Sequence, residues 1–441
     1  MKVLLCQSYL GPGTPEPLVF PIGLAYLASS LNDNYEVQVW DSNTSEDPVK
    51  DLSSILENFK PDIVGVSLRN IDSVICSSKR SYYVPFVSFI RMLKQKLPSC
   101  KLIVGGPGFS IFSKEIMKRN KEIDFGVVSE GELVFAQLLG HLDHPEHVKN
   151  LVFRKKGKLF FTERAELVDF DTLPPPSREK FNMKMYQNIQ AAMGIQSKRG
   201  CSFGCIYCVH RFYMGTVCRL RSPKKVVDEL EDLVNNYDLK SFYFVDPVFN
   251  YPLNHAREIC LEINRRKLNI QWEAAFRPDF INARFMEEAV KAGCILFDFS
   301  PDGASNEAMR ILGKNLRVEH VDRTISLARM VEGVTVAYEF LYDLPSGNAW
   351  NNLGLVRLFS KISVLNSTKL RYLLLSKMRI FPNTPLHKIA LSQGKISEAT
   401  DLLFPVHYES GGLTSFTNIF PRISRGSAIS IQKLVKCFSE L

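Results

Sequence analysis

Three cysteines within eight residues are the clearest sign of chemistry in this sequence. Cys201, Cys205 and Cys208 form a C-x3-C-x2-C pattern inside the stretch KRGCSFGCIYCVH, residues 198–210. The chain has 10 cysteines in 441 residues. Chance alone would produce this spacing with a probability of roughly 0.5%. Cysteine thiolates bind zinc and the irons of iron–sulfur clusters, so the pattern predicts a metal site.

Two kinds of metal site fit the pattern. Zinc would take the three thiolates and His210 as a tetrahedral Cys3His set, although a histidine two positions after a cysteine lies outside the usual ligand spacing. A cubane iron–sulfur cluster takes one cysteine per iron, so three cysteines leave one iron open to a chelating substrate. Gly200 and Gly204 would let the loop wrap such a cluster. The odd number of thiols argues against a disulfide scaffold.

Length and composition limit the class of protein. A chain of 441 residues with 45% apolar and 23% charged residues suits two globular domains. The formal charge of +9 permits an anionic substrate or an acidic partner but is too small for a nucleic-acid-binding signature. The first residues are not a convincing signal peptide, and no apolar run reaches the ~18 residues of a membrane span. We therefore expect a cytoplasmic protein without a membrane span.

Short β-rich runs alternate with helical patterns in residues 1–145, which predicts an α/β domain with a doubly wound parallel sheet. The expected strands are Val3–Cys6, Val37–Trp40, Asp62–Leu68, Lys101–Val104 and Asp124–Val128. Ligands of such sheets bind beyond the carboxyl ends of the strands. Small or polar residues stand there, at Ser67, at 105–108 and at 129–132. The glycines among them would let a bulky ligand approach the backbone, or they are ordinary turn residues.

A linker is expected at residues 146–190. The stretch LVFRKKGKLFF, residues 151–161, is typical of a hairpin with a Lys-Gly turn. The prolines of the following stretch FDTLPPPSREKF cannot continue a helix or a central strand. We therefore place the boundary between two domains here.

Residues 191–400 repeat a strand–helix pattern. The expected strands are Ser241–Val245, Gln271–Phe276, Cys294–Phe299, Val334–Leu341 and Leu370–Lys377. With a further strand before the cysteine loop, they predict six βα units in a partial barrel, with its site at the carboxyl ends of the strands. Asp246, Arg277, Ser300 and Asp302 stand near those ends. Residues 401–441 remain as a short C-terminal extension, whose last part, Ser427–Leu441, is amphipathic.

A basic stretch follows the cysteines. It runs from Arg211 to Lys225 and also carries Arg219, Arg221 and Lys224. Ser222-Pro223 lies within it, and serine followed by proline is typical of a helix N-cap and first helical position. The charges are expected to lie on a solvated helix start. The alternative is a docking surface for an acidic electron donor such as flavodoxin.

The first half of the chain resembles the cobalamin-binding domain that precedes the catalytic domain of many radical SAM enzymes. The matching pieces are FPIGLAYLASSL, IVGVSL, IVGGPG and DFGVVSEGE, in this order. The residues implied to contact cobalamin are Ser67, Gly105, Gly106, Pro107, Gly108, Glu130 and Gly131. The Asp-x-His-x-x-Gly of the mutases is missing, and the first histidine is His141, so the resemblance implies a corrin without a histidine lower ligand. A generic flavodoxin-like domain is the alternative.

The second half resembles the radical SAM superfamily. An aromatic residue, Tyr207, precedes the last cysteine of the cluster pattern, and FSPDGASNEAMRILGKN is similar to a Ser-x-Asp-Gly/Ser-x-Ser piece followed by Leu-Gly-Lys in cobalamin-dependent members. The resemblance implies a [4Fe–4S] cluster on the three cysteines, with S-adenosylmethionine (SAM) on the open iron. The residues implied to bind SAM are Tyr207, Asp246, Arg277, Ser300 and Asp302. The Gly-Gly-Glu of many members is missing after the second strand.

Together the two resemblances imply a cobalamin-dependent radical SAM methyltransferase of class B. Such an enzyme would methylate an unactivated carbon, or phosphorus, of a small-molecule or natural-product substrate. Its cofactors would be a [4Fe–4S] cluster, SAM and cobalamin, its electron donor flavodoxin or ferredoxin, and it would have no nucleic acid as partner. Cyclisation or ring contraction with the same cofactors is the first alternative.

Two further alternatives stay open. A methylthiotransferase would need a second cluster on three N-terminal cysteines, for which Cys6, Cys76 and Cys100 are available, but the tail after residue 400 is too short for the RNA-binding domain of that family. A zinc-binding protein without enzymatic activity is the alternative of a different class. We expect the cysteines outside the cluster pattern to be buried thiols. They are Cys6, Cys76, Cys100, Cys218, Cys260, Cys294 and Cys437.

Overall fold

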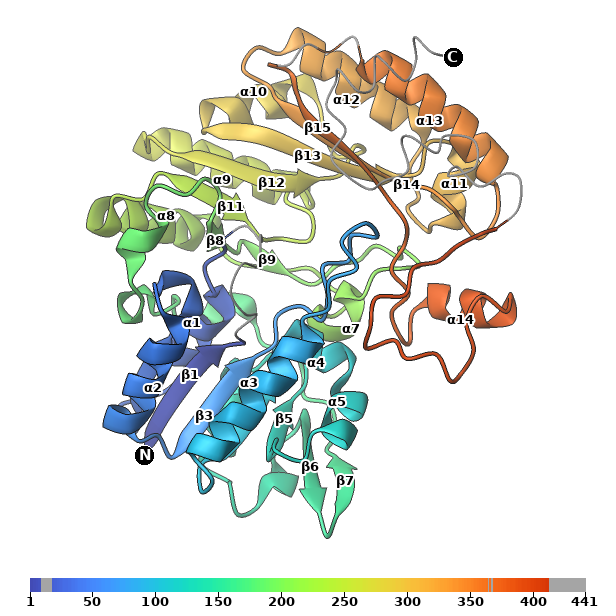
Figure 1. The fold of residues 1–441 in the computed structure, drawn as a ribbon. Helices are drawn as coiled ribbons and strands as arrows, with labels where there is room; N and C mark the ends of the chain where they lie inside the picture. Colours follow the sequence, from blue (N-terminus) through green and yellow to red (C-terminus); the bar gives the residue numbers. More distant parts are fainter. Residues whose placement is uncertain (9–17, 364, 366–367, 412–441) are drawn as a thin grey trace. The chain divides into compact units, whose positions relative to one another are not determined.

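The computed structural model describes residues 1–8, 18–363, 365 and 368–411 (Figure 1). Contacts divide the chain into two compact units. The first consists of Met1–Ser73, Arg80–Gly194 and His210–Leu220, and the second of Val74–Lys79, Ile195–Val209 and Arg221–Leu441. Neither unit is one continuous stretch of the chain. Val74–Lys79 interrupts the first unit and belongs to the second, and His210–Leu220 interrupts the second unit and belongs to the first. The amphipathic segment Ser427–Leu441 lies outside the described residues.

The first unit contains a seven-stranded sheet with the order β2-β1-β3-β4-β5-β6-β7. Its strands are β1 Lys2–Gln7, β2 Glu36–Trp40, β3 Ile63–Ser67, β4 Lys101–Gly105, β5 Phe125–Val127, β6 Leu151–Lys155 and β7 Lys158–Phe161. β1 pairs in parallel with β2 and β3, and β4 and β5 continue the parallel part. This confirms the doubly wound parallel sheet and places its switch point between β1 and β3.

The expected hairpin forms from β6 and β7, which pair antiparallel and bring Lys155 opposite Lys158. β6 also pairs antiparallel with β5, where Phe153 lies opposite Phe125. The hairpin therefore extends the first sheet at its edge and does not stand in a linker. Adjacent antiparallel strands need only a tight turn, which is why the sequence pattern identifies the hairpin but not the strand on which it docks.

Seven helices are described in the first unit. They are α1 Ile22–Ser29, α2 Pro48–Phe59, α3 Tyr83–Lys96, α4 Pro107–Ile111, α5 Ser113–Arg119, α6 Glu132–Leu139 and α7 His210–Met214. The bounds of α2 follow from local chemistry. The side chain of Asp47 accepts a hydrogen bond from the backbone N–H of Lys50, proline occupies the first turn, and Lys60 ends the helix in the left-handed conformation.

The second unit contains a six-stranded sheet with the order β15-β14-β13-β12-β11-β8. Its strands are β8 Met193–Ile195, β11 Ser241–Phe244, β12 Gln271–Phe276, β13 Cys294–Asp302, β14 Val336–Leu341 and β15 Leu370–Ser376. The pairs from β11 to β15 are parallel. Strands that follow one another along the chain are neighbours in the sheet, which is the arrangement of a partial (βα)6 barrel.

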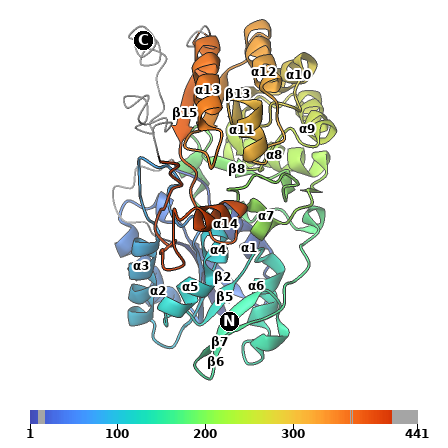
Figure 2. The same ribbon diagram turned by 90° about the vertical axis from the view of Figure 1, so that its right-hand side faces the viewer.

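Helices line one face of this second sheet (Figure 2). The helices of the unit are α8 Pro223–Tyr237, α9 Leu253–Arg266, α10 Ala283–Lys291, α11 Asn306–Ile311, α12 Val318–Met330, α13 Asn348–Ile362 and α14 Pro385–Ser392. The expected start of α8 is confirmed. The side chain of Ser222 accepts a hydrogen bond from the backbone N–H of Lys225, and Pro223 occupies the first turn.

The two faces of the second sheet differ in chemistry. On the helix side Trp272, Phe297 and Phe299 are buried, and the ring centroids of Phe276 and Phe297 lie 4.7 Å apart. On the other face alternate residues are polar and only partly buried, among them Asp298 and its neighbours described below. Because side chains alternate between the faces of a strand, the apolar core and the polar face both follow from the sequence pattern.

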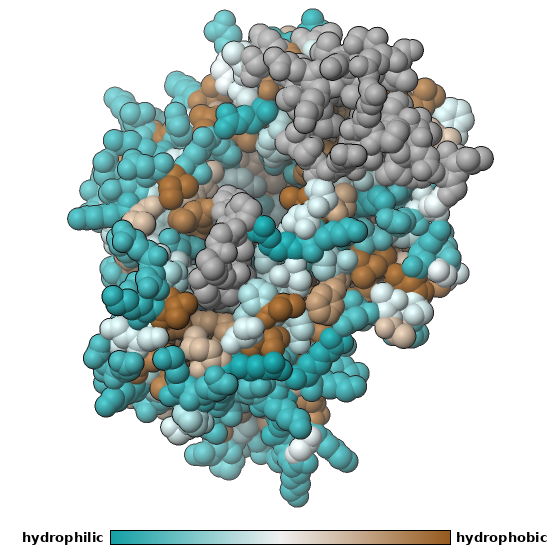
Figure 3. Space-filling view, in the orientation of Figure 1, coloured by the Kyte–Doolittle hydropathy of each residue, from teal (hydrophilic) through white to brown (hydrophobic). Residues whose placement is uncertain are grey.

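On the face drawn in Figure 3, the coloured part of the surface is mainly hydrophilic, with hydrophobic residues scattered over it. Exposed ion pairs contribute to this character, for example Arg265 and Glu262, with 2.6 Å between Nη2 and Oε1. None of the helices in the described residues combines the length and the apolar character needed to cross a membrane.

Candidate functional site

The three expected cluster ligands lie in one loop, directly after β9 (Lys198–Arg199). Cys201, Cys205 and Cys208 are not joined in a disulfide, and all are partly exposed. By contrast, Cys260 and Cys294 of the same unit are buried in the packed core. Partly exposed thiols on a loop are accessible to a metal group, whereas thiols in a packed core are inert.

Backbone contacts hold the cysteine loop in place. The backbone N–H of Ile206 donates to the carbonyl oxygen of Leu312 at 3.0 Å, and the carbonyl oxygen of Ile206 accepts from the backbone N–H of Leu386 at 3.0 Å. Gly313 has a φ of +68°, and a Cβ at this position would lie 2.4 Å from the carbonyl oxygen of Gly204. Both the conformation and the close approach require glycine here.

Tyr207, between the second and third cysteines, is fixed by its hydroxyl group. The hydroxyl donates to Asp302 Oδ2, and Lys314 Nζ forms an ion pair with the same oxygen at 2.6 Å. Lys314 Nζ also donates to the carbonyl oxygen of Ser300 at 2.7 Å. Asp302 has a φ of +61°, an uncommon conformation that aims its side chain where the strand ends. The structure thus brings Tyr207 and Asp302 together, and their contact with SAM stays a prediction.

Arg277 contacts both Lys314 and the cysteine loop. Its guanidinium donates to the carbonyl oxygen of Lys314 at 2.9 Å and pairs with both oxygens of Asp279 at 3.0 and 2.9 Å. It also lies over the ring of Phe203, 3.8 Å from the centroid. Phe203 stands between the first two cysteines, so Arg277 is next to the cysteine loop as expected. Its role toward the SAM carboxylate stays a prediction.

Asp246, the expected contact for the SAM amino group, is engaged within the protein. Its two oxygens accept hydrogen bonds from the backbone N–H groups of Ser197 at 2.8 Å and Lys198 at 3.2 Å, and from the Ser197 hydroxyl. Burial raises the pKa of this carboxyl group, and Lys198 and the hydrogen bonds oppose the rise. Asp246 therefore orders the segment that leads into the cysteine loop, and a contact with SAM stays a prediction.

Ser300 belongs to a polar cluster on the open face of the second sheet. Its hydroxyl donates to Glu339 Oε2 at 2.9 Å, and the Tyr372 hydroxyl donates to Asp298 Oδ2 at 2.7 Å. Asp298 Oδ1 is buried and has no hydrogen-bond partner in the part of the chain that the structure describes. Burial raises the pKa of Glu339 to about 7, with further contributions from Asp298 and Asp302. Burial raises the pKa of Asp298 to about 6, so the ionised carboxylates are unfavourable here.

The donor set fits an iron–sulfur cluster with one open iron. Three cysteines outside any disulfide lie on one loop, and no fourth cysteine stands in this stretch of sequence. Burial raises the pKa of the Cys201 thiol, while the positive charges of Arg277 and Lys314 oppose the rise. Because a thiol must lose its proton to bind iron, these cations favour metal binding by the loop.

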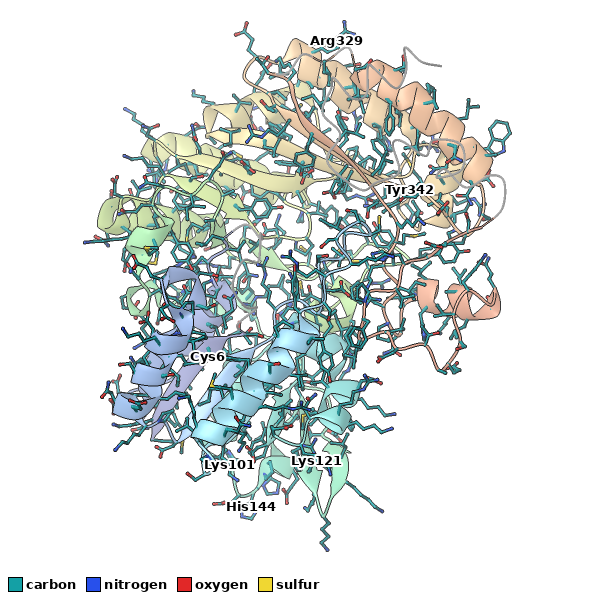
Figure 4. The ribbon with its side chains drawn as sticks, viewed as in Figure 1. Cys6, Lys101, Lys121, His144, Arg329 and Tyr342 are labelled. Atoms are coloured by element: carbon teal, nitrogen blue, oxygen red, sulfur yellow. The ribbon has the colours of Figure 1, made fainter. Side chains whose placement is uncertain are left out.

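The residues expected to contact cobalamin lie at the carboxyl ends of the strands of the first sheet. The backbone N–H of Ser8 donates to the carbonyl oxygen of Ser67 at 3.0 Å, which aligns the ends of β1 and β3. Gly106 has a φ of +96°, and a Cβ there would lie 2.7 Å from the carbonyl oxygen of Leu68. The loops after β3 and β4 therefore meet closely. The amino ends of the strands lie on the opposite side of the sheet, where Lys101 begins β4 (Figure 4).

Buried polar atoms without partners gather on the segments that follow β1 and β3. Ser8 is 3% exposed and Tyr82 is 2% exposed, yet Ser8 Oγ and Tyr82 Oη have no hydrogen-bond partner among the described residues. The same holds for Gln7 Oε1 and Ser73 Oγ. Buried polar groups are almost always paired, and these atoms stand near the switch point of the sheet. They fit a polar ligand such as a corrin with its amide groups.

Glu130 and Ser129 form hydrogen bonds with the segment His210–Leu220, which follows the cysteines and belongs to the first unit. Arg219 Nη2 and Nη1 donate to the two carboxylate oxygens of Glu130 at 2.6 and 2.9 Å, and Ser129 Oγ donates to the carbonyl oxygen of Tyr213 at 2.6 Å. The contact of Glu130 with cobalamin stays a prediction, as does that of Gly131, Gly105, Pro107 and Gly108.

The expectation of a solvated basic stretch is wrong for its two central arginines. Arg219 pairs with Glu130 inside the first unit, and the side chains are only 14% and 9% exposed. Arg221 Nη1 pairs with Glu229 Oε2 at 2.6 Å inside the second unit. Both charges are neutralised by buried carboxylates, so neither can carry a docking surface for an acidic electron donor.

The remaining cysteines divide into two groups. Cys6, Cys100, Cys260 and Cys294 are buried as expected, whereas Cys76 and Cys218 are partly exposed and Cys437 lies outside the described residues. Cys6 lies on β1, and both Cys6 and Cys100 are buried in the core of the first unit. Because thiols in a packed core are inert, this burial argues against a second cluster on the three N-terminal cysteines.

Sequence reasoning missed four residues near the cysteine loop and on the open face of the barrel sheet. They are Lys314, Asp298, Glu339 and Tyr372. A signal was available for two of them, because Asp298 and Glu339 are single charged residues inside strand patterns that are otherwise apolar. A charge inside a central strand is rarely tolerated without a partner. Lys314 gave no signal beyond its place in the Leu-Gly-Lys piece.

Comparison with known proteins identifies both halves of the chain. Residues 13–139 match the B12 binding domain family, and residues 195–338 match the radical SAM superfamily. An uncharacterized methyltransferase of Pyrococcus horikoshii is 27% identical over 338 residues, with 76% of this chain and 71% of that protein covered. The anaerobic magnesium-protoporphyrin IX monomethyl ester cyclase of Rubrivivax gelatinosus is 27% identical over 353 residues, with 75% of this chain and 60% of that protein covered.

A solved structure shows the same fold. The radical SAM methyltransferase TsrM from Kitasatospora setae, determined with tryptophan substrate and a SAM analogue, gives a TM-score of 0.75 at 21% identity, covering 89% of this chain and 76% of that chain. The two matched families, in this order and with the cysteine loop at the start of the second, account for both halves of the sequence. The chain therefore belongs to the radical SAM superfamily, among its members with an N-terminal B12-binding domain.

Proposed function

We propose that this protein is a cobalamin-dependent radical SAM methyltransferase that methylates an unactivated carbon, or phosphorus, of a small-molecule substrate. The observation that carries the proposal is the combination, in one chain, of a partly exposed three-cysteine loop and a sheet whose strand ends carry buried polar atoms without a hydrogen-bond partner among the described residues. The methyltransferase of P. horikoshii supports it by sequence, and TsrM, which is a methyltransferase, supports it by fold.

The cofactors follow from the two families: a [4Fe–4S] cluster with SAM, and cobalamin. When bound, they supply a radical that removes hydrogen from the substrate and a methyl group that replaces it. The chain itself binds and orients these groups. Cys201, Cys205 and Cys208 provide the thiolates, and the contacts of Gly313 and Asp302 hold their loop in place.

The polar cluster on the open face of the second sheet supports binding of a polar substrate. Glu339 and Asp298 lie on β14 and β13, at the face that the helices leave free. With pKa values of about 7 and about 6, raised above all by burial, both groups exchange protons near neutral pH. They can therefore accept or donate hydrogen bonds to a substrate according to its charge.

A second candidate is a radical SAM enzyme that closes a ring. The cyclase of R. gelatinosus is as similar in sequence as the methyltransferase, at 27% identity. A methylthiotransferase is disfavoured, because Cys6 and Cys100, two of the three thiols that a second cluster would need, are buried in the core of the first unit.

The deciding experiment is product analysis with the full chain, reconstituted anaerobically with iron and sulfide. The reduced protein is incubated with SAM, with and without cobalamin, and with extracts or small-molecule candidates as substrate. We expect S-adenosylhomocysteine and 5′-deoxyadenosine, with the former dependent on cobalamin. Release of 5′-deoxyadenosine alone would support the ring-closing candidate, and turnover independent of cobalamin would refute the proposal.

Matched cysteine variants test the site. Cys205→Ala should abolish both products and lower the iron content, because it removes a cluster ligand. Cys218→Ala removes another partly exposed thiol and should leave both unchanged. Comparing flavodoxin, ferredoxin and dithionite as reductants tests the proposed electron donor.

A further inference from the structure

A buried ion pair stands next to the cysteine loop. Lys314 Nζ lies 2.6 Å from Asp302 Oδ2, and the two side chains are only 9% and 8% exposed. Asp302 also accepts the hydrogen bond of the Tyr207 hydroxyl. A hydrogen-bonded chain therefore runs from a residue between two cluster ligands to a buried ammonium group.

The backbone places this ammonium group beside the loop. Lys314 directly follows Gly313, which lies against Gly204 of the cysteine loop. The carbonyl oxygen of Lys314 accepts a hydrogen bond from Arg277 at 2.9 Å, and its Nζ donates to the carbonyl oxygen of Ser300 at 2.7 Å. Both ends of Lys314 are thus fixed, so its charge has a defined place.

Lys314 carries its charge inside the protein, next to the cysteine loop. Its ion pair with Asp302 raises the pKa of Lys314 against the effect of burial, so the ammonium group stays protonated. Charges interact more strongly inside a protein than in water, and the net charge near an iron–sulfur cluster helps to set its reduction potential.

We propose that Lys314 is a positioning residue whose buried ammonium group, held by Asp302, stabilises the reduced form of the cluster. The proposal rests on the cluster that the three cysteines hold. Reduction adds one negative charge to the cluster, so a nearby positive charge favours the reduced state. The negative charge of Asp302 disfavours the reduced state. Removing the charge of Lys314 and removing the charge of Asp302 should therefore shift the reduction of the cluster in opposite directions, which a merely structural role would not do.

The test is a redox titration of the cluster in the reconstituted full chain, followed by electron paramagnetic resonance without SAM. Lys314→Met should lower the ratio of reduced to oxidised cluster at a given potential about tenfold, which is about 59 mV for one electron. Asp302→Asn should raise the ratio, because it leaves the lysine charge uncompensated. Lys314→Arg should restore the behaviour of the wild type. Lys291→Met, on an exposed residue of α10, should have no effect.

The outcomes separate the possible failures. Shifts in the same direction for Lys314→Met and Asp302→Asn, or no shift in either, with wild-type iron content, would overturn the role of Lys314. If Lys314→Met does not retain iron, Asp302→Asn still tests the proposal: a higher ratio of reduced to oxidised cluster than in the wild type supports it, and a lower or unchanged ratio overturns it. If the wild type itself takes up no iron and sulfide, the cluster assignment fails and not the role of Lys314.

Discussion

Replacing Glu339 by glutamine should stabilise the protein at high pH. The carboxyl group of Glu339 lies partly buried on the open face of the barrel sheet, next to Asp298 and hydrogen-bonded by Ser300. Its pKa is raised from 4.5 to about 7, first by burial and then by Asp298. At pH 8 the folded protein must therefore ionise a group that favours its neutral form, and glutamine removes this requirement while keeping an oxygen for Ser300.

The magnitude follows from the difference in pKa between the folded and the unfolded chain. A difference of about 2.5, from 4.5 to about 7, corresponds to about 3 kcal/mol at 1.36 kcal/mol per pKa unit. The folded pKa is the higher one, so Glu339 imposes no penalty on the folded state below about pH 4.5. The penalty grows as the pH rises and reaches its full size above about pH 7. At pH 5 it amounts to about 1 kcal/mol.

Urea unfolding under anaerobic, reducing conditions at pH 5 and pH 8 measures the effect. Tryptophan fluorescence follows the unfolding of the whole chain, because the buried Trp40 lies in the first unit and the buried Trp272 in the second. We expect Glu339→Gln to exceed the wild type in unfolding free energy by about 3 kcal/mol at pH 8 and by about 1 kcal/mol at pH 5. Glu287→Gln, an exposed residue of α10, serves as the control without a pH-dependent difference.

Two results would refute the reasoning. One is a difference in unfolding free energy between variant and wild type that is the same at both pH values, which would mean that folding does not raise the pKa of Glu339. The other is a variant that is less stable at pH 8, which would mean that the ionised Glu339 makes favourable contacts. Asp298→Asn, with a pKa of about 6 in the wild type, should show the same trend with a smaller amplitude.

Two further predictions concern the contacts around the site. Gly313→Ala should lower the iron and sulfide bound per chain, because its Cβ would meet Gly204 in the cysteine loop. Gly394→Ala shares the positive φ, at +64°, but has open space, so it should keep full iron content, and equal losses in both would contradict the clash. Arg219→Ala should lower the free energy of unfolding of the chain, measured with urea, by up to about 3–5 kcal/mol, because Glu130, whose side chain is only 9% exposed, loses the guanidinium that donates to both of its oxygens. The exposed Arg265→Ala should change little, and an equally small effect of Arg219→Ala would show that the pair is not needed.

Much of the fold was predictable because it depends on local patterns. The alternation of β13 places Phe297 and Phe299 in the core and Asp298 on the open face, and this period is visible in the sequence. The N-cap Ser222 and the following proline are adjacent residues, so the start of α8 was predictable too. The position of the hairpin on β5 was not, because nothing in the hairpin pattern specifies its neighbour.

The partners of the charged residues were also not predictable. Arg219 and Arg221 look alike in the sequence, yet one pairs with Glu130 in the first unit and the other with Glu229 in the second. The residue to which an arginine pairs depends on which loops the fold brings together. A count of basic residues therefore predicted a solvated surface where the structure has buried ion pairs.

The sequence by itself determined the chemistry of this protein: the cysteine spacing, the alternating strands and the order of the two domains are local or short-range patterns. Only the tertiary structure decided how the cysteine loop is held and charged. Tyr207 and Asp302 are 95 residues apart, and Lys314 meets Asp302 across a helix. Such contacts depend on the packing of β13 and the loop after α11 against the cysteine loop. Packing is a property of the whole chain, and no stretch of the sequence encodes it alone.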